Sequence, residues 1–327
     1  MPVALITGIS GQDGSYLAES LLTRGYTVHG VVRSAAPEDF PALQNPNVTL
    51  HEIDIAAPAA LSAAVAQVEP DEIYNLAAVS SVFRSWQEPV HTAEVNALPV
   101  AQLLESAWSL QQRLGRPVRF AQASSAELFG QATVSPQNES TPINPSSPYG
   151  AAKAYAHHMV GVYRQRGLFA TSCILYNHES PRRPEAFVTR KITASAARIA
   201  AGLQQSLELG NLTARRDWGW APDFAEALRL AATAPTASDY VIATGETHSI
   251  ADFVERAFAR VGIADWKSVV SIDESFSRPV DPIEQSGDAS RARAELNWRP
   301  TMTFEGIVDA MVDEDVRLVR GGLDTRG

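Results

Sequence analysis

A tyrosine and a lysine four residues apart could form a proton-transfer pair. Tyr149 and Lys153 lie in the segment SPYGAAKAY. Pro148 disfavours the α region at Ser147, so a helix that begins near Tyr149 would place the phenol and the ammonium on one face. A neighbouring ammonium favours the phenolate and lowers the tyrosine pKa, which would make Tyr149 a usable base. The pattern YxxxK is common by chance, so its value depends on its surroundings.

A serine and a glutamate precede this pair in the segment QASSAELFG. Ser125 could hydrogen-bond to a substrate hydroxyl and to Tyr149. Glu127 is distinctive, because hydride transfer at one carbon needs one base, whereas removal of water across two carbons needs a second acid/base group. The alternative is a carboxylate that merely favours the start of a helix. The predicted catalytic set is Ser125, Glu127, Tyr149 and Lys153.

Three glycines near the N-terminus indicate a dinucleotide site. Gly8, Gly11 and Gly14 form GxxGxxG in TGISGQDG, directly after an expected strand and at the opening of a helix. Glycine allows a tight turn, close approach of the backbone to pyrophosphate and packing of the helix on the strand. The helix N-terminus then receives the anion. A structural turn without a ligand is the alternative. The predicted cofactor contacts here are Gly8, Ile9, Ser10, Gly11, Gln12, Asp13 and Gly14.

The end of the second expected strand distinguishes the two nicotinamide dinucleotides. Sites that prefer NAD usually carry a carboxylate there, which binds the ribose 2′-hydroxyl. This chain has Arg33 in HGVVRSA, and its guanidinium could pair with a 2′-phosphate through two hydrogen bonds. The sequence therefore predicts NADP. A surface arginine without a ligand is the alternative.

Later strand ends fit the same crevice, because the carboxyl ends of successive parallel strands meet at one edge of a sheet. Asp54 follows the third expected strand and could accept a hydrogen bond from the adenine amino group. Small residues in NLAAVS would let the backbone lie against the cofactor. Lys153 could hold the nicotinamide ribose, close to Tyr149. The predicted contacts at these places are Asp54, Ile55, Leu76, Ala77, Ala78, Ser80, Tyr149 and Lys153.

The elements that must position these residues alternate between short apolar runs and longer amphipathic stretches. Strands are expected over residues 3–6, 27–32, 48–51, 73–76, 118–122 and 170–175, and helices over 15–24, 59–68, 91–114 and 149–166. Gly25 would end the first helix. This alternation is typical of βαβ units. The sequence predicts an α/β fold with a Rossmann-type, doubly wound parallel sheet.

The alternation of short apolar runs and amphipathic stretches gives way to a different pattern from residue 177 onward. Segments rich in proline and arginine, SPRRPEAF and SFSRPVDP, separate helices expected over 187–201, 220–234 and 250–261. Such loops suit a lid over a ligand better than a sheet interior. Residues 239–245 have the pattern of a strand that returns to the first domain. We therefore expect a Rossmann domain over 1–176 and a smaller, interleaved substrate-binding domain over 177–327.

Composition excludes several classes of partner. The 327 residues carry a formal net charge of -10, which argues against nonspecific attraction to nucleic acid or to an anionic membrane. No window approaches the roughly 18 apolar residues of a membrane span, and the first residues lack a signal-peptide pattern, so the expected location is the cytoplasm. The single cysteine, Cys173, lies in the apolar run TSCILY and is expected to be a buried strand residue. No metal site is predicted.

Taken together, the segments resemble the GDP-mannose 4,6-dehydratase family of the extended short-chain dehydrogenase/reductase superfamily. TGISGQDGSYLAE, NLAA, SSAELFG, SPYGAAKAYA, NHESPRR, FVTRKI, LGNLTARRDWG, VIATGETHS and RPVDPIEQSGD follow that family's order over roughly residues 3–315. NHESPRR and RRDWG are the specific segments. The resemblance implies conversion of GDP-mannose to GDP-4-keto-6-deoxymannose with tightly bound NADP. The implied steps are oxidation at C4, loss of water across C5 and C6, and hydride return to C6.

The resemblance also assigns roles by position. It implies that Ser125, Glu127 and Tyr149 are catalytic and that Lys153 supports the tyrosine and the cofactor. It implies further cofactor contacts at His178 and Arg183. The substrate contacts that it implies are Ser85, Asn177, Glu179, Lys191, Arg216, Arg278 and Asp281, the last at the guanosine ribose.

The chain departs from the family at several places. Ser125 replaces a threonine, and both Ser81 and Trp220 replace histidines, so contacts to the sugar differ. The loop after Arg33 is short and lacks the family's second arginine, in a segment that helps join dimers into tetramers. The helices expected over 91–114 and 149–166 resemble those that pair across a two-fold axis. We therefore expect a homodimer and regard a tetramer as the alternative.

Other functions remain open at this stage. Within the superfamily, the rivals are a nucleotide-sugar epimerase and a UDP-glucuronate decarboxylase. The decarboxylase is the sharper rival, because it too has a carboxylate near the catalytic serine, and NHESPRR and RRDWG argue against it. A noncatalytic NADP-binding protein could share the fold, since fold does not determine function. Such a protein would have no reason to keep Ser125, Glu127, Tyr149 and Lys153 together.

Overall fold

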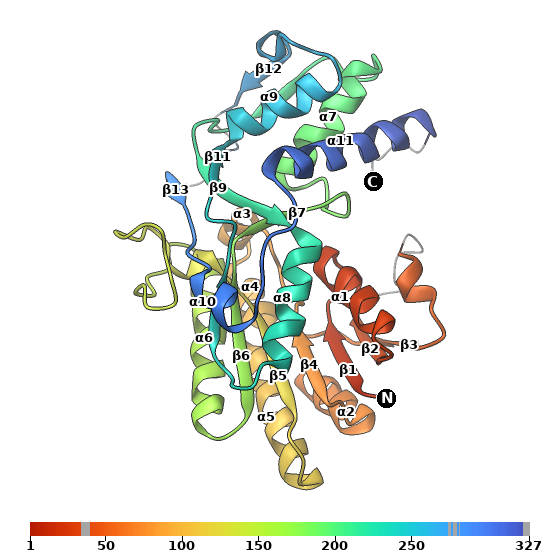
Figure 1. Cartoon of the computed structure of the whole chain (residues 1–327), viewed down its shortest axis with the longest axis vertical. Coiled ribbons are helices and arrows are strands. Elements are labelled where there is room, and N and C mark those ends of the chain that lie inside the picture. The colour runs from red at the N-terminus through yellow and green to blue at the C-terminus, as the bar shows by residue number, and fades with distance from the viewer. Residues whose placement is uncertain (34–39, 274–275, 277–279, 281, 323–327) are drawn as a thin grey trace.

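A parallel β-sheet lies at the centre of the larger part of the molecule (Figure 1). The structure is a computed structural model that describes residues 1–33, 40–273, 276, 280 and 282–322. Within these residues the sheet has seven strands in the order β10-β6-β5-β4-β1-β2-β3, and neighbouring strands are parallel. The order reverses between β1 and β4, where doubly wound sheets open a ligand crevice. The strands are β1 (Val3–Thr7), β2 (Thr27–Val32), β3 (Val48–Glu52), β4 (Glu72–Asn75), β5 (Arg119–Ser125), β6 (Phe169–Leu175) and β10 (Asp239–Ile242).

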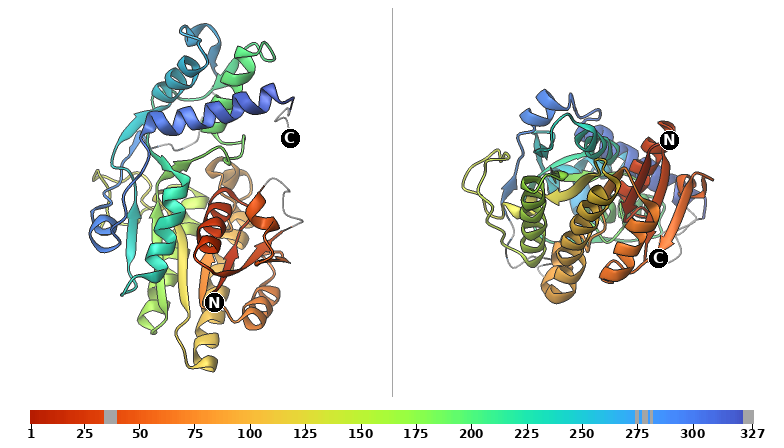
Figure 2. Two further views of the ribbon diagram at one scale, coloured as in Figure 1. Left: turned by 45° about the vertical axis from the view of Figure 1, so that its right-hand side comes forward. Right: turned by 90° about the horizontal axis from the view of Figure 1, so that it is seen from below.

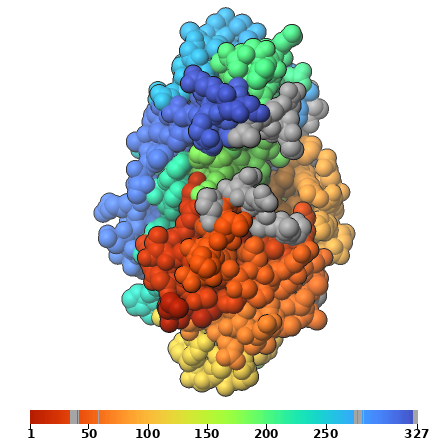
Figure 3. Space-filling model, turned by 90° about the vertical axis from the view of Figure 1, so that its right-hand side faces the viewer, coloured from red at the N-terminus to blue at the C-terminus, as the bar shows by residue number. Residues whose placement is uncertain are grey.

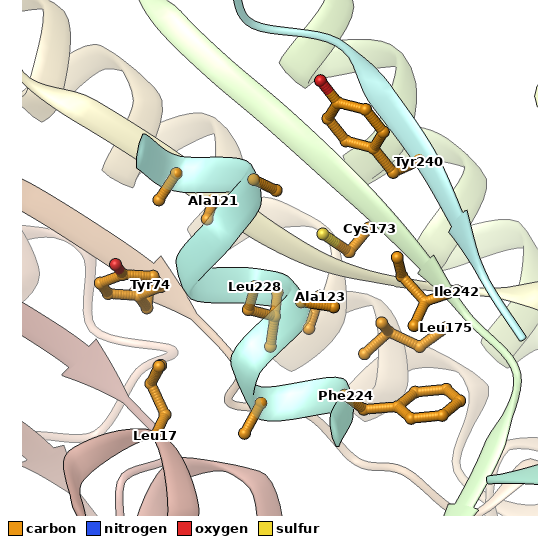
Figure 4. Close-up of a cluster of buried hydrophobic side chains, with 14 of the residues drawn as sticks. Leu17, Tyr74, Ala121, Ala123, Cys173, Leu175, Phe224, Leu228, Tyr240 and Ile242 are labelled. Carbon is orange, nitrogen blue, oxygen red and sulfur yellow. The ribbon is translucent and has the colours of Figure 1, made fainter. Parts of the chain in front are cut away.

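Helices cover both faces of this sheet. α1 and α8 pack together on one face, over a core that includes Leu17, Cys173 and Leu228 (Figure 4). α2, α5 and α6 lie side by side on the other face, around Leu104 and Phe120 (Figure 2, right). The helices of this part are α1 (Gln12–Thr23), α2 (Pro58–Val68), α3 (Val82–Gln87), α4 (Pro89–Asn96), α5 (Leu98–Leu114), α6 (Pro148–Gln165), α8 (Ala221–Thr233) and α10 (Ser290–Glu295).

The smaller part surrounds an apolar cluster of its own, which includes Trp218, Phe253 and Met311. Figure 3 shows green and blue atoms of this part above the N-terminal residues in red and orange. β9 pairs with β7, β11 and β13, while β8 pairs with β12. The elements are β7 (Asn177–Glu179), α7 (Val188–Ala200), β8 (Leu207–Leu209), β9 (Arg215–Trp220), β11 (Thr247–Ser249), α9 (Ile250–Arg260), β12 (Val270–Ile272), β13 (Glu284–Gln285) and α11 (Phe304–Arg320).

The predicted doubly wound fold is confirmed, and the strand expected over 239–245 does return to the large sheet, as β10 beside β6. The single helix expected over 91–114 is wrong, because the chain breaks at Ala97 into α4 and α5. Pro99 lies in the first turn of α5, where its ring and missing N–H prevent a continuous helix. Neither β9 nor α11 was expected. The domain division at residue 176 stays a prediction.

Cys173 is fully buried in β6, and burial raises the pKa of its thiol, which confirms a packing role. Gly25 follows α1 with a φ of +78°, as expected for a residue that ends a helix. Within the described ranges, no helix combines the length and apolar character needed to cross a membrane.

Candidate active site

A cavity of about 560 Å³ brings the predicted catalytic residues together. Ser125 comes from the end of β5, Glu127 from the turn after it, and Tyr149 and Lys153 from α6. The smaller part forms the other wall. Further predicted residues that line the cavity are Asp13, Leu76, Ala78, Ser80, Asn177, His178, Glu179, Arg183, Lys191 and Arg216.

The start of α6 positions Tyr149. Ser147 adopts extended backbone before Pro148, and its hydroxyl accepts a hydrogen bond from the Gly150 amide at 3.0 Å, which caps the helix. A Cβ at Gly150 would lie 2.5 Å from the Glu127 carbonyl oxygen. Because glycine stands there, α6 can pack directly against the segment that carries Glu127.

Tyr149 and Lys153 are both buried, and burial controls their pKa values. Burial, helped by the charge of Glu127, raises the pKa of Tyr149 to about 12, against an opposing hydrogen bond from Ser125. Burial lowers the pKa of Lys153 to about 8, although the charge of Asp13 opposes it. The Lys153 ammonium donates to the Ala123 carbonyl at 2.8 Å and lies 5.7 Å from the centroid of the Tyr149 ring. The expected lowering of the tyrosine pKa is therefore wrong for the protein alone, since desolvation outweighs the Ser125 hydrogen bond and the Arg183 charge that favour the phenolate.

Ser125 and Glu127 are joined by a short turn. The Ser125 hydroxyl accepts a hydrogen bond from the Glu127 amide at 3.2 Å. The Glu127 side chain is half-buried and lines the cavity beside Tyr149. Ser125, Tyr149 and Glu127 thus bring two hydroxyl groups and one carboxyl group to the same cavity, which suits more than one proton transfer.

The glycine-rich turn leaves no room for side chains. Gly8 has a φ of +70°, and a Cβ there would lie 2.9 Å from the Ala77 backbone. A Cβ at Gly14 would lie 2.3 Å from the Gly8 carbonyl oxygen. Gly8 and Gly14 therefore hold β1, α1 and the segment after β4 in close contact, as dinucleotide sites require. Ile9 turns its side chain into the core, against Gly30.

An ion pair ties the first turn of α1 to the smaller part. His178 Nε2 lies 2.9 Å from Asp13 Oδ2, and His178 Nδ1 lies 2.7 Å from the Tyr176 carbonyl oxygen. Since both neighbours are acceptors, the imidazole carries two protons. Burial opposes both charges, but the attraction and the hydrogen bond between the two groups prevail, so the pKa of His178 is raised and that of Asp13 lowered. Gln12 Nε2 also donates to the His178 carbonyl at 3.2 Å.

Cations line the cavity from the smaller part. Arg183 Nε lies 3.2 Å from Glu179 Oε2, and its guanidinium lies over the Phe187 ring at 3.8 Å. Burial raises the pKa of Glu179, although Arg183 opposes the shift. Lys191 donates to the Glu208 carbonyl at 2.7 Å, and Arg216 donates to the Pro282 carbonyl at 2.8 Å. The cavity therefore gathers several cations in an acidic chain, beside the carboxyl groups of Asp13, Glu127 and Glu179.

Some predicted residues lie outside the cavity lining. Arg33 and Asp54 are exposed at the carboxyl ends of β2 and β3, along the same edge of the sheet, and Ile55 follows them half-buried. Ser85 is buried in α3, where its hydroxyl donates to the Val82 carbonyl at 2.6 Å. The predictions for Arg278 and Asp281 lie outside the described residues.

Two family departures take structural roles. Ser81 lines the cavity and caps α3, because its hydroxyl accepts from the Arg84 amide at 3.2 Å. Trp220 ends β9 and packs against the cluster of the smaller part.

The sequence reasoning missed buried polar residues on three central strands, β1, β4 and β5. Thr7, Asn75 and Gln122 are all at most 2% exposed and are hydrogen-bonded to one another. The available signal was a polar residue inside each of the apolar runs ALITG, IYNLA and RFAQA.

The comparisons with known proteins agree with this geometry. A family model described as GDP-mannose 4,6 dehydratase matches residues 5–311. The chain is 45% identical to GDP-mannose 4,6 dehydratase 2 of Arabidopsis thaliana, over 97% of this chain and 88% of that protein. It is 42% identical to GDP-mannose 4,6 dehydratase of Homo sapiens, over 97% and 92%.

Solved structures show the same architecture. The UDP-glucose 4-epimerase of Thermotoga maritima superposes with a TM-score of 0.85 at 24% identity, over 97% of this chain and 99% of that one. The UDP-glucose 4-epimerase of Thermus thermophilus, in complex with NAD, superposes with a TM-score of 0.81 at 26% identity, over 96% and 98%. The epimerases share the fold, whereas the family model and the relatives match the sequence along nearly the whole chain. The chain therefore belongs to the GDP-mannose 4,6-dehydratase family.

Proposed function

We propose that this protein is a nucleotide-sugar 4,6-dehydratase that converts GDP-mannose to GDP-4-keto-6-deoxymannose with bound NADP. The observation that carries the proposal is the position of Glu127, which lines one cavity with Ser125, Tyr149 and Lys153. A carboxyl group at that place supplies the second acid/base function that elimination of water needs.

The residues at the crevice fit a dinucleotide. The turn from Gly8 to Gly14 and the N-terminus of α1 would hold the pyrophosphate. Arg33 would pair with the 2′-phosphate, and Lys153 would hold the nicotinamide ribose. The Thermus thermophilus epimerase of the same fold contains NAD in its complex. Bound NADP would accept a hydride in its oxidised form, whose nicotinamide ring carries a positive charge, and would donate the hydride again in its reduced form.

Tyr149 would take the proton from the sugar C4 hydroxyl while the C4 hydride leaves. Its pKa of about 12 in the protein alone means that positive charge beside the phenol is needed for this step. Ser125 would hydrogen-bond to the C4 oxygen and keep it within reach of the phenol. The product of this step is a ketone at C4, which acidifies the hydrogen on C5.

Glu127 would then remove the C5 proton and deliver a proton to the leaving C6 hydroxyl, so that water departs. When the hydride returns to C6, C5 would take up a proton through Glu127, and the proton that Tyr149 took from the C4 hydroxyl would replace it, so that both residues end in their starting protonation state. The atoms balance as the loss of one water, and the dinucleotide ends in its starting oxidation state. Lys191 and Arg216 would neutralise the diphosphate of the substrate, which an acidic chain can bind only at a local basic site.

The test is product analysis. Purified protein is incubated with GDP-mannose, and the nucleotide sugar is followed by mass spectrometry together with the absorbance of NADPH. We expect a product lighter by one water and no NADPH accumulation. Stoichiometric NADPH would contradict the proposal. Parallel incubations with UDP-glucose and UDP-glucuronate detect an epimerase or a decarboxylase, since a decarboxylase releases carbon dioxide.

A further inference from the structure

A line of hydrogen bonds crosses β1, β4 and β5 of the large sheet and finishes at Lys153. The Thr7 hydroxyl donates to Asn75 Oδ1 at 2.6 Å, and Asn75 Nδ2 donates to Gln122 Oε1 at 2.8 Å. Gln122 Nε2 donates to the Ala123 carbonyl at 2.9 Å. Lys153 Nζ donates to that same carbonyl at 2.8 Å. Every side chain in the line is at most 4% exposed, so water does not compete for these bonds.

The Ala123 carbonyl sets the direction of the whole line, because a carbonyl oxygen can only accept. Gln122 must therefore turn its N–H toward Ala123 and its oxygen toward Asn75. Asn75 must then present its own N–H to Gln122 and its oxygen to Thr7. The Thr7 hydroxyl must donate, which leaves its lone pairs for other donors.

Those lone pairs accept the backbone amides of Leu76 at 3.1 Å and Ala77 at 3.2 Å. Leu76 and Ala77 belong to the segment that we propose lies against the cofactor, and Thr7 directly precedes Gly8 in the glycine-rich turn. The line thus connects both dinucleotide-facing segments with the ammonium of the catalytic set.

We propose that Gln122, oriented by Asn75, is a positioning residue that sets the place and the proton affinity of the Lys153 ammonium through the carbonyl they share. Two donors on one oxygen divide its acceptor capacity, and their positive ends repel each other. Gln122 therefore makes the ammonium form less stable than it would be with the carbonyl to itself. The inference rests on the proposed function only for the role of Lys153 in turnover.

The surroundings of Lys153 make this effect measurable near neutral pH. Burial lowers its pKa to about 8, and the charge of Asp13 on α1 opposes the shift. The other titratable or charged groups that line the cavity near it are Tyr149 on α6, Glu127 after β5, and His178 and Arg183 from the smaller part. None of these side chains is altered by a substitution at Gln122.

The test measures the lysine directly. The sequence contains three lysines, Lys153, Lys191 and Lys267, so selective ¹³C-lysine labelling yields few signals, and the Cε chemical shift reports protonation. Gln122→Met keeps the length of the side chain and removes its N–H. Gln122→Glu replaces the N–H by oxygen and adds a negative charge. The matched control is Ser172→Ala, because Ser172 pairs with Gln122 across β5 and β6, is fully buried, and has a hydroxyl without a hydrogen-bond partner in the described chain.

We expect the pKa of Lys153 to rise on the order of 0.5 pH unit in Gln122→Met and by about one unit or more in Gln122→Glu, with no change in Ser172→Ala. The high-pH limb of the kcat profile should move in the same direction, whereas a purely structural defect would lower kcat without moving it. An unchanged or lowered lysine pKa in Gln122→Met would overturn the inference. If Gln122→Glu does not fold, Gln122→Met still decides.

The NMR titration needs no turnover, so it separates this inference from the proposed function. If the native protein does not convert GDP-mannose but the Lys153 titration shifts in the Gln122 variants, the proposed function alone is refuted. Native activity with unshifted titrations would refute the positioning role alone.

Discussion

Glu127 separates elimination from simple oxidation at the scale of single residues. Glu127→Gln keeps the shape of the side chain, but an amide cannot accept the C5 proton. We expect turnover to fall about 10²–10⁴-fold, which is the usual contribution of one acid/base group. Exchange of the C5 hydrogen with deuterated solvent should be lost as well.

Tyr149→Phe is the matched comparison for that variant, because it removes the base of the preceding step. It should abolish the transient NADPH absorbance in a single turnover, whereas Glu127→Gln should preserve it. Near-normal turnover of Glu127→Gln would remove the main chemical support for a dehydratase.

Arg33 is the second residue whose chemistry can be isolated. It is exposed at the end of β2, where only NADP would present a 2′-phosphate to its guanidinium. Arg33→Ala should weaken the binding of NADP by about 1.5 kcal/mol or more, roughly tenfold in Kd, and leave the binding of NAD almost unchanged. Calorimetric titration with both dinucleotides measures the difference, and Arg299→Ala, another exposed arginine, serves as the control. Equal weakening of NADP and NAD would show that Arg33 is a surface residue without this role.

The edge of the sheet contains a pH-sensitive contact between two elements. His29 Nδ1 on β2 lies 2.9 Å from His51 Nε2 on β3, so the two rings share one proton. Burial lowers the pKa of both imidazoles, and the charge of His51 lowers that of His29 further. Because the folded pKa values are lowered, protonation favours the unfolded chain. The stability from this contact is present above about pH 6.5 and is lost as the pH falls below that value.

Urea unfolding at several pH values tests this contact. Native protein should lose stability between pH 7 and pH 5.5 more steeply than His51→Gln. The glutamine at position 51 does not titrate, so that variant lacks one of the two groups whose protonation favours the unfolded chain. His91→Gln, a substitution of a histidine on α4, should follow the native curve. The raised pKa of His178 contributes a slope of opposite sign, but it is common to all three proteins and cancels in their differences. Parallel curves for native protein and His51→Gln would refute the shared proton.

Assembly belongs to the scale of the whole molecule. Exposed apolar side chains gather on α4, α5 and α6, namely Val90 at 70%, Leu98 at 58%, Tyr155 at 40% and Val162 at 55% exposure. Such a surface on neighbouring helices is typical of an interface, and a two-fold dimer uses one patch twice. We therefore propose a homodimer through these helices. The loop after Arg33 is acidic at Glu38 and Asp39 and poor in arginine, so we expect no further assembly into a tetramer.

Light scattering with NADP present measures the assembly. We expect a mass near twice 35.3 kDa for the native protein and a shift toward 35.3 kDa for Val162→Glu, because a charge there would be desolvated in the interface. Leu203→Glu, which alters an exposed apolar residue away from these helices, should remain dimeric. A native mass near four times 35.3 kDa would count against the loop argument and leave the proposed activity untouched.

Much of this protein follows from local sequence alone. The alternation of apolar runs and amphipathic stretches determined the parallel strands, and the family follows from motifs such as NHESPRR. Ser125, Glu127, Tyr149 and Lys153 could be predicted as one set, because each stands at a strand end or helix start whose geometry is known. The break at Ala97 could also have been read from Pro99.

Contacts between distant residues needed the tertiary structure. His178 contacts Asp13, which lies 165 positions earlier in the sequence. No local sequence pattern predicts a doubly protonated imidazole at His178. The high pKa of Tyr149 reflects desolvation, which depends on everything packed around the phenol. The hydrogen-bond line to Lys153 exists only because the sheet places β1, β4 and β5 side by side. Spacing along the chain determines which chemical groups an element presents, whereas burial and partners arise only when the elements pack together.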